Sequence, residues 1–174
     1  MKMKINVILV DITKQDTEAI VNPANKSLLG GGGGDGAIHR SAGSELLEEC
    51  KTLGGCKTGE AKITKGYNLK AKFVIHTVGP VYGAEKNKEA ELLRNCYINS
   101  LKLASEKGIK SISFPSISTG AYDYPKEEAC EIAVKACMGF GEALDEIRLV
   151  VFDKESLELY NQEVAKNQKG ANLL

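Results

Sequence analysis

Two hydrophobic periodicities alternate along the chain. Short runs of apolar, often β-branched residues are followed by longer segments in which apolar side chains recur every three or four positions. Continuous apolar runs are typical of strands covered on both faces, and the second pattern is typical of helices that cover a sheet. The alternation favours an α/β sandwich over an all-β fold or a helix bundle.

The apolar runs predict six strands: Ile5 to Asp11, Ala19 to Val21, Ala61 to Lys65, Phe73 to Val78, Ser111 to Phe114, and Arg148 to Phe152. The helical pattern predicts five helices: Gly36 to Ala42, Ser44 to Leu53, Lys88 to Lys107, Lys126 to Phe140, and Lys154 to Gln168. No internal repeat or separating linker is visible. At 174 residues the chain is long enough for one core, so we expect a single domain over residues 1–174.

Charge and cysteine content narrow the class of protein. The 23 basic and 23 acidic residues balance, which argues against a general nucleic-acid or membrane-surface binder. No apolar stretch approaches the roughly 20 residues that span a bilayer. The five cysteines form no C-x-x-C pair and the chain has two histidines, so we expect no metal and no cofactor. Cys130 and Cys137 share one face of a predicted helix. The expected protein is a monomer in a reducing cytoplasm.

The stretch from Asn22 to His39, NPANKSLLGGGGGDGAIH, has the most unusual composition. Glycine runs are common in flexible linkers, but only 29 residues precede Gly30, too few for a separate core. An ordered chain keeps consecutive glycines where side chains would obstruct a close approach. Backbone N–H groups that lead into a helix N-terminus attract anions, phosphate above all, and Asp35 places a carboxylate at the same point.

The run matches neither common nucleotide motif. A Walker A loop requires lysine after its last glycine, where this chain has Asp35, and a Rossmann fingerprint requires an acidic residue after a second strand, which here would fall near Glu60. A second loop, Ser116 to Tyr122, offers hydroxyls, amides and an aromatic ring after another strand. Ligands in open α/β sheets lie outside the carboxyl ends of strands, so the loops that begin at Asp11, Asn22, Ser116 and Asp153 are expected to converge there.

Five stretches together resemble a known family: VDIT, NPANKSLLGGGGGDGAIHRSAG, TGEAKIT, FVIHTVGP and FPSISTGAYDYP. In this order and spacing they are similar to the macrodomains, specifically the MacroD-type hydrolases, over nearly the whole chain from Ile5 to about Tyr160. The resemblance implies a three-layer α/β/α sandwich with a mixed, mostly parallel central sheet. It also implies that ADP-ribose binds in a cleft above that sheet.

The resemblance assigns binding roles along the cleft. Asp11 and the amide of Ile12 would contact the adenine, and Phe152 would either stack on it or belong to the core. Asn25 would bond a hydroxyl of the distal ribose, while Asn22 would brace the loop. Tyr122 would pack on that ribose. The diphosphate would lie between two groups of backbone amides: Gly32, Gly33 and Gly34, and Ser118, Thr119, Gly120, Ala121 and Tyr122.

Asp35 resembles the family's proposed general base, with Asn25 as the second catalytic residue. A carboxylate at a helix N-terminus would have a lowered pKa, which the bound diphosphate would oppose. In the alternative mechanism a substrate phosphate positions the water and Asp35 only orients the ribose. His39 could tune Asp35, although a structural role is favoured for it, as for His76.

The resemblance implies a metal-independent, ADP-ribose-binding hydrolase that cleaves ester-type linkages at the distal ribose. Its substrate would be O-acetyl-ADP-ribose, a protein carrying mono-ADP-ribose on acidic side chains, or both. The alternatives are a non-catalytic ADP-ribose reader and an ADP-ribose phosphate phosphatase.

Three positions depart from the family pattern: Val10 and Asp123 stand where glycine is usual, and Gly34 replaces a branched apolar residue.

Overall fold

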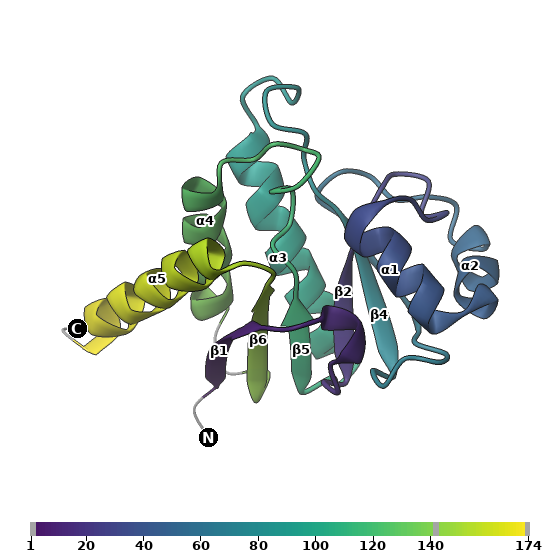
Figure 1. Cartoon of the computed structure of the whole chain (residues 1–174), viewed down its shortest axis with the longest axis horizontal. Helices are drawn as coiled ribbons and strands as arrows, with labels where there is room; N and C mark the ends of the chain where they lie inside the picture. Colours follow the sequence, from purple (N-terminus) through teal and green to yellow (C-terminus); the bar gives the residue numbers. More distant parts are fainter. Residues whose placement is uncertain (1–2, 141–142, 173–174) are drawn as a thin grey trace.

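A six-stranded sheet crosses the centre of the computed structural model, which describes residues 3–140 and 143–172 (Figure 1). The strands are β1 (Lys4–Leu9), β2 (Ala19–Ala24), β3 (Ala61–Lys65), β4 (Phe73–Val78), β5 (Ser111–Phe114) and β6 (Glu146–Val151). Their order is β1-β6-β5-β2-β4-β3. Only the β3–β4 pair is antiparallel within this sheet, so the predicted mixed, mostly parallel arrangement is confirmed.

Helices cover both faces of the sheet. On one face lie α1 (Gly33–Ala42) and α2 (Ser44–Lys51), and on the other lie α3 (Glu89–Glu106), α4 (Lys126–Gly139) and α5 (Lys154–Asn172) (Figure 1). A short 3₁₀-helix, η1 (Ile12–Lys14), follows β1. The three-layer α/β/α sandwich is confirmed. No helix among the described residues combines the length and the hydrophobicity needed to cross a bilayer.

The two faces of β2 show how the sequence builds two cores. Ala19 and Val21 belong to the cluster beneath α3, α4 and α5, whereas Ile20 and Ala24 belong to the cluster beneath α1 and α2. Asn22 points to the same face as Ile20, so a polar side chain lies inside the second core with no exposed surface. In the first core, Cys130 and Cys137 are both buried on α4 as expected.

Several element boundaries differ from the predicted ones. Strand β2 continues through Pro23 to Ala24, because β5 pairs only with Ala19 and Ile20 and leaves Pro23 a free edge on that side. Helix α1 begins at Gly33 instead of Gly36, although glycine is a poor helix former. Strand β6 begins at Glu146, before the apolar run. The remaining bounds agree within two residues, except that α5 continues to Asn172.

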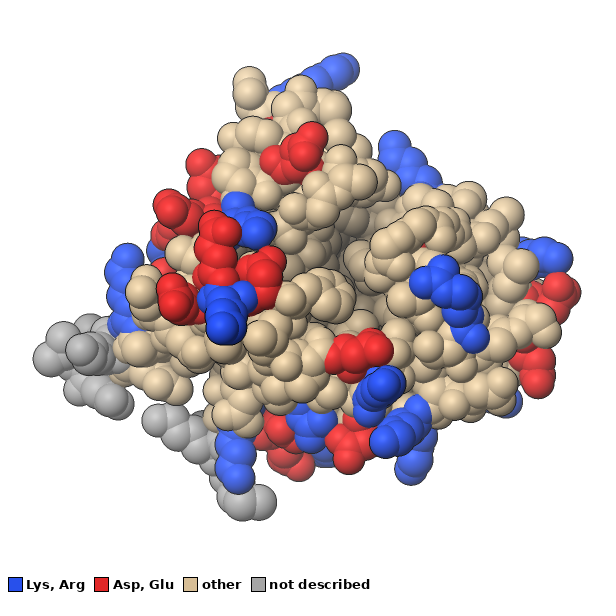
Figure 2. Space-filling view, viewed as in Figure 1, with Lys and Arg blue, Asp and Glu red and all other residues tan. Residues whose placement is uncertain are grey.

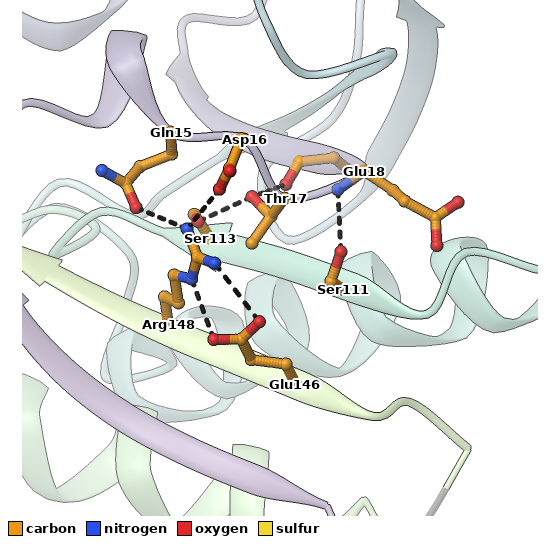
Figure 3. A network of polar contacts seen from close by, with 9 residues as sticks. Gln15, Asp16, Thr17, Glu18, Ser111, Ser113, Glu146 and Arg148 are labelled. Carbon is orange, nitrogen blue, oxygen red and sulfur yellow. Dashed lines mark hydrogen bonds and ion pairs between the residues drawn. The ribbon is translucent and has the colours of Figure 1, made fainter.

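A polar network ties the segment after η1 to the sheet at the amino-terminal end of the strands (Figure 3). The Arg148 guanidinium on β6 donates to Gln15 Oε1 at 2.9 Å and to Asp16 Oδ1 at 2.8 Å, and it also pairs with Glu146. Nearby, the hydroxyls of Thr17 and Ser113 lie 2.7 Å apart. The network fixes one end of a short segment whose other end is Ile12, a residue of the cavity described next.

Candidate functional site

A cavity of about 580 Å³ lies at the carboxyl ends of β2, β4, β5 and β6. Figure 2 shows the hollow at the centre of this face, bordered mainly by uncharged surface. Its lining comes from residues 23–25, 31–35, 115–122 and 151–153, together with Ile12, Gly79, Lys126 and Ser156. The predicted convergence of loops is therefore observed for the glycine run, the Ser116 to Tyr122 loop and the segment after β6.

Nearly all of the predicted site residues line this cavity: Ile12, Asn25, Gly32, Gly33, Gly34, Asp35, Ser118, Thr119, Gly120, Ala121, Tyr122 and Phe152. Asp11 does not. Its Oδ1 accepts hydrogen bonds from Thr13 Oγ1 at 2.7 Å and from the Thr13 N–H at 2.9 Å, which caps η1. These two bonds lower the pKa of the exposed Asp11 carboxyl. The capping role is therefore present, and the adenine contact stays a prediction.

The glycines of this segment are needed for three different reasons. Gly30 and Gly33 have φ angles of +88° and +55°, a left-handed conformation that favours glycine. A Cβ on Gly36 would collide with the Gly31 carbonyl, so the first turn of α1 has no room for one. At Gly32 the space around a Cβ is open, and this residue lines the cavity. A side chain there would occupy ligand space.

Free backbone amides lie along both sides of the cavity. In the described part of the chain, no hydrogen bond uses the N–H groups of residues 31–35 or 118–122 as donors. The hydroxyls predicted to help bind a diphosphate are partly occupied, because Thr119 Oγ1 donates to Ser116 Oγ at 2.9 Å. Ser118 Oγ is buried without a partner, and its φ of +68° is left-handed. Amides are thus the main donors available to an anion.

Asp35 lies at the base of the glycine loop and is 5% exposed. Its Oδ1 accepts a hydrogen bond from Asn22 Nδ2 at 2.9 Å, and His39 Nε2 lies 3.4 Å away without a hydrogen bond. Burial raises the pKa of the Asp35 carboxyl, which the Asn22 bond and His39 partly oppose. The lowered pKa expected from the helix N-terminus alone is wrong, because desolvation outweighs the contributions that lower the Asp35 pKa.

The two asparagines exchange part of their expected roles. Asn25, not Asn22, braces the glycine loop: its Nδ2 donates to the Gly30 carbonyl at 2.9 Å, and its Oδ1 accepts from Ser27 Oγ at 2.7 Å. Asn22 instead lies behind Asp35 and contacts His76 Nδ1 at 3.0 Å. Asn25 still lines the cavity, so its contact with a ribose hydroxyl stays a prediction.

The structure excludes the core interpretation of Phe152, and stacking on the adenine stays a prediction. It also places two residues that depart from the family pattern. The Phe152 ring is 65% exposed at the cavity rim, so it is not a core residue. Asp123 has a φ of +58°, which explains why glycine is usual there, and its exposed side chain is not part of the lining. A Cβ on Gly34 would lie 3.2 Å from Pro23 Cγ, which is a crowded contact, so glycine at this position lets α1 begin close against Pro23.

Sequence reasoning did not single out Lys126 or Gly79 as lining residues. Lys126 Nζ lies 3.3 Å from Asp153 Oδ2 and 3.6 Å from Glu155 Oε2, so the lysine charge is already paired at the rim. Gly79 directly follows β4, and a Cβ there would collide with Ser118 Oγ. The signal for Gly79 was the FVIHTVGP stretch, since a glycine after a strand often permits close approach. Lys126 lies at the start of a helix, and no sequence signal indicated that it lines the cavity.

Acidification is expected to destabilise the fold through His76. Burial lowers the pKa of His76 to about 3, so the native ring stays neutral while the unfolded chain gains a proton below its ordinary pKa of 6.5. Stability is therefore lost as pH falls through this window, by about 2 kcal/mol at pH 5. Urea unfolding at pH 7 and pH 5 measures the loss, which should shrink in His76→Gln. An equal loss in both proteins would exclude His76 as its source.

Known proteins resemble this chain in sequence and structure. The Macro domain family matches residues 21–133. A macro domain-containing protein of Chlorobaculum tepidum is 54% identical over 92% of this chain and 95% of its own length. The O-acetyl-ADP-ribose deacetylase of Escherichia fergusonii is 52% identical over 93% and 96%.

Solved structures agree with the sequence matches. The Oceanobacillus iheyensis macrodomain with ADP superposes with a TM-score of 0.91 at 42% identity, covering 98% of this chain and 97% of the other. The Trypanosoma brucei macrodomain in complex with ADP-ribose gives a TM-score of 0.85 at 44% identity, covering 91% and 68%. The sheet order, the glycine loop and these matches lead to one conclusion: the chain belongs to the macrodomain family.

Proposed function

We propose that this macrodomain binds ADP-ribose and hydrolyses ester-type linkages at the distal ribose. The substrates would be O-acetyl-ADP-ribose, proteins that carry mono-ADP-ribose on acidic side chains, or both. The observation that carries the proposal is the position of Asp35, a buried carboxylate whose pKa is raised, beside free amides in a cavity of about 580 Å³. Relatives named O-acetyl-ADP-ribose deacetylase and macrodomains solved with ADP-ribose support the assignment.

The binding step uses dipoles in place of a basic patch. Amides of residues 31–35 and 118–122 would surround the diphosphate, since they have no other acceptor among the described residues. Among the described residues, Lys126 is the only basic side chain of the lining, and it is paired with Asp153 and Glu155. Phe152 and Ile12 would enclose the adenine at one end, which leaves the distal ribose near Asp35.

In the chemical step Asp35 would act as a general base. A water molecule loses a proton to the Asp35 carboxylate as its oxygen bonds to the acyl carbon, and the bond between that carbon and the ribose oxygen breaks. The proton then passes to the ribose oxygen, which yields ADP-ribose and a free carboxylic acid. The raised pKa of Asp35 brings its basicity closer to neutral pH, where a general base is most effective. No metal is required in this scheme.

Calorimetric titration with ADP-ribose, ADP and AMP, alongside assays of acetate release from O-acetyl-ADP-ribose, tests the proposal. ADP-ribose should bind more tightly than ADP, because only ADP-ribose carries the distal sugar. Acetate should be released, and release should persist with a chelator present. Equal affinity for ADP-ribose and ADP would contradict distal-ribose recognition. Tight binding without turnover of either class of ester would contradict the hydrolase and favour a non-catalytic ADP-ribose reader.

A further inference from the structure

A chain of buried polar groups lies behind Asp35 and reaches across the sheet to β3. Asn22 on β2 and His76 on β4 are paired in the parallel register, and both are fully buried on the face covered by α1 and α2. Asn22 Nδ2 lies 2.9 Å from Asp35 Oδ1 and 3.0 Å from His76 Nδ1. On the far side of the ring, His76 Nε2 lies 2.9 Å from Thr64 Oγ1. The proposed hydrolysis mechanism assigns no role to Asn22, His76 or Thr64.

The direction of each hydrogen bond follows from the groups at the two ends. Thr64 Oγ1 donates to the Lys65 carbonyl at 3.1 Å, so this oxygen accepts the proton of His76 Nε2. His76 Nδ1 is then an acceptor, and it takes one of the two hydrogens of Asn22 Nδ2. The other hydrogen goes to Asp35 Oδ1. If the Asn22 amide were reversed, its oxygen would face both the carboxylate and the ring lone pair, an arrangement with two repulsive contacts.

We propose that Asn22 and His76 are a positioning pair for Asp35: they hold its carboxylate as a hydrogen-bond acceptor, with Oδ1 fixed against the sheet and Oδ2 left for the cavity. Asp35 Oδ2 forms no hydrogen bond within the described residues, and it is not among their fully buried polar atoms. His76 acts only through Asn22 and does not contact the ligand space. The catalytic meaning of the pair rests on the proposed function.

The two side chains behind Asp35 act on it as uncharged dipoles near pH 7. From α1, His39 Nε2 lies 3.4 Å from Asp35 Oδ1, and from α2 the Cys50 thiol lies 3.8 Å from His76 Nε2. Burial lowers the pKa of His76 to about 3 and raises the pKa of Cys50 to about 11, so both are neutral near pH 7. Burial also raises the pKa of Asp35, and the Asn22 bond is the largest opposing contribution. Fixed dipoles, which do not titrate, therefore keep Asp35 able to accept a proton.

Direct titration of the Asp35 carboxyl by NMR of carbon-labelled protein tests the pair without any activity assay. Asn22→Leu removes the donor and His76→Leu removes the acceptor that orients it, so each should raise the Asp35 pKa by about one pH unit or more. His76→Gln keeps an acceptor and should titrate close to the original protein. Ser100→Ala removes a buried hydroxyl on α3 that has no hydrogen-bond partner among the described residues, and it serves as the control in which the Asp35 pKa stays the same.

Turnover supplies the second readout. With Asp35 harder to ionise, the acid limb of the pH–rate profile should move to higher pH in both leucine variants. Where the pH lies below the apparent pKa of the acid limb, kcat should fall about tenfold for each pH unit by which that limb moves, with little change in KM. An unaltered Asp35 pKa in the folded leucine variants would overturn the positioning pair. If the original protein hydrolyses no ester, the proposed function fails, while the NMR titration still decides the role of the pair.

A third variant keeps the test decisive if the leucine variants do not fold. Thr64→Val has nearly the same shape but cannot accept the His76 Nε2 proton. The ring should then shift toward the Nδ1–H tautomer, which is visible in its nitrogen chemical shifts, and the Asn22 amide should reverse. The Asp35 pKa should rise in the same direction as in the leucine variants. A changed tautomer with an unchanged Asp35 pKa would also overturn the proposal.

Discussion

Replacing Asp35 with alanine is expected to lower the single-turnover rate on O-acetyl-ADP-ribose by about 10²- to 10⁴-fold, the range for loss of a general base. The affinity for ADP-ribose should change far less, because the amides of residues 31–35 and 118–122 remain. Removal of a negative charge beside a diphosphate also cannot weaken the anion site. Rapid-quench kinetics and calorimetry on the same preparation separate the two effects.

A nearby carboxylate provides the matched control for this experiment. Asp123 follows the second loop, but its exposed side chain is not part of the cavity lining, so Asp123→Ala should keep the original rate. The pH profile adds an independent check. Because burial raises the Asp35 pKa and a base works only when ionised, the rate should rise with pH through a value above the ordinary 3.8. A single-turnover rate that Asp35→Ala leaves intact would assign catalysis to the substrate phosphate.

Most strands of the sheet could be predicted from the sequence, because the apolar pattern marks where they begin and end. Three strands, Ala61 to Lys65, Phe73 to Val78 and Ser111 to Phe114, begin and end where the apolar pattern places them. Burial makes hydrophobicity the main constraint on the residues of β4 and β5, whereas the edge strand β3 is only partly buried. The pattern failed in β2, where Asn22 and Pro23 interrupt the apolar run. These residues are set by the site, since Asn22 holds Asp35 and Pro23 lines the cavity.

The location of the site was also readable, because it depends on topology. Loops that follow parallel strands emerge at one edge, so the residues after β2, β5 and β6 were expected to meet. The hydrogen-bond partners of individual side chains could not be predicted from the sequence. Whether Asn22 or Asn25 braces the loop depends on which face of the backbone each residue occupies at the end of the strand. The pKa of Asp35 depends on a burial that local sequence does not specify.

Mutation of Phe152 to alanine is expected to weaken ADP-ribose binding by about 5- to 150-fold, which corresponds to the 1–3 kcal/mol of an aromatic ring stacked on a base. Phe152 lies at the cavity rim and is 65% exposed, so its ring is free to stack on a base that enters the cavity. Because little of the ring is buried, the melting temperature should stay nearly constant. Calorimetry and thermal unfolding measure the two quantities.

The ligand series makes the Phe152 experiment specific for the adenine. ADP-ribose, ADP and AMP share the base, so Phe152→Ala should weaken all three by the same factor, whereas ribose 5-phosphate, which lacks the base, should be unaffected. Phe152→Tyr keeps an aromatic face and should bind close to the original protein. A loss confined to ADP-ribose would instead place the ring beside the distal sugar, at the Asp35 end of the cavity. That result would reverse the ligand orientation on which the catalytic role of Asp35 depends.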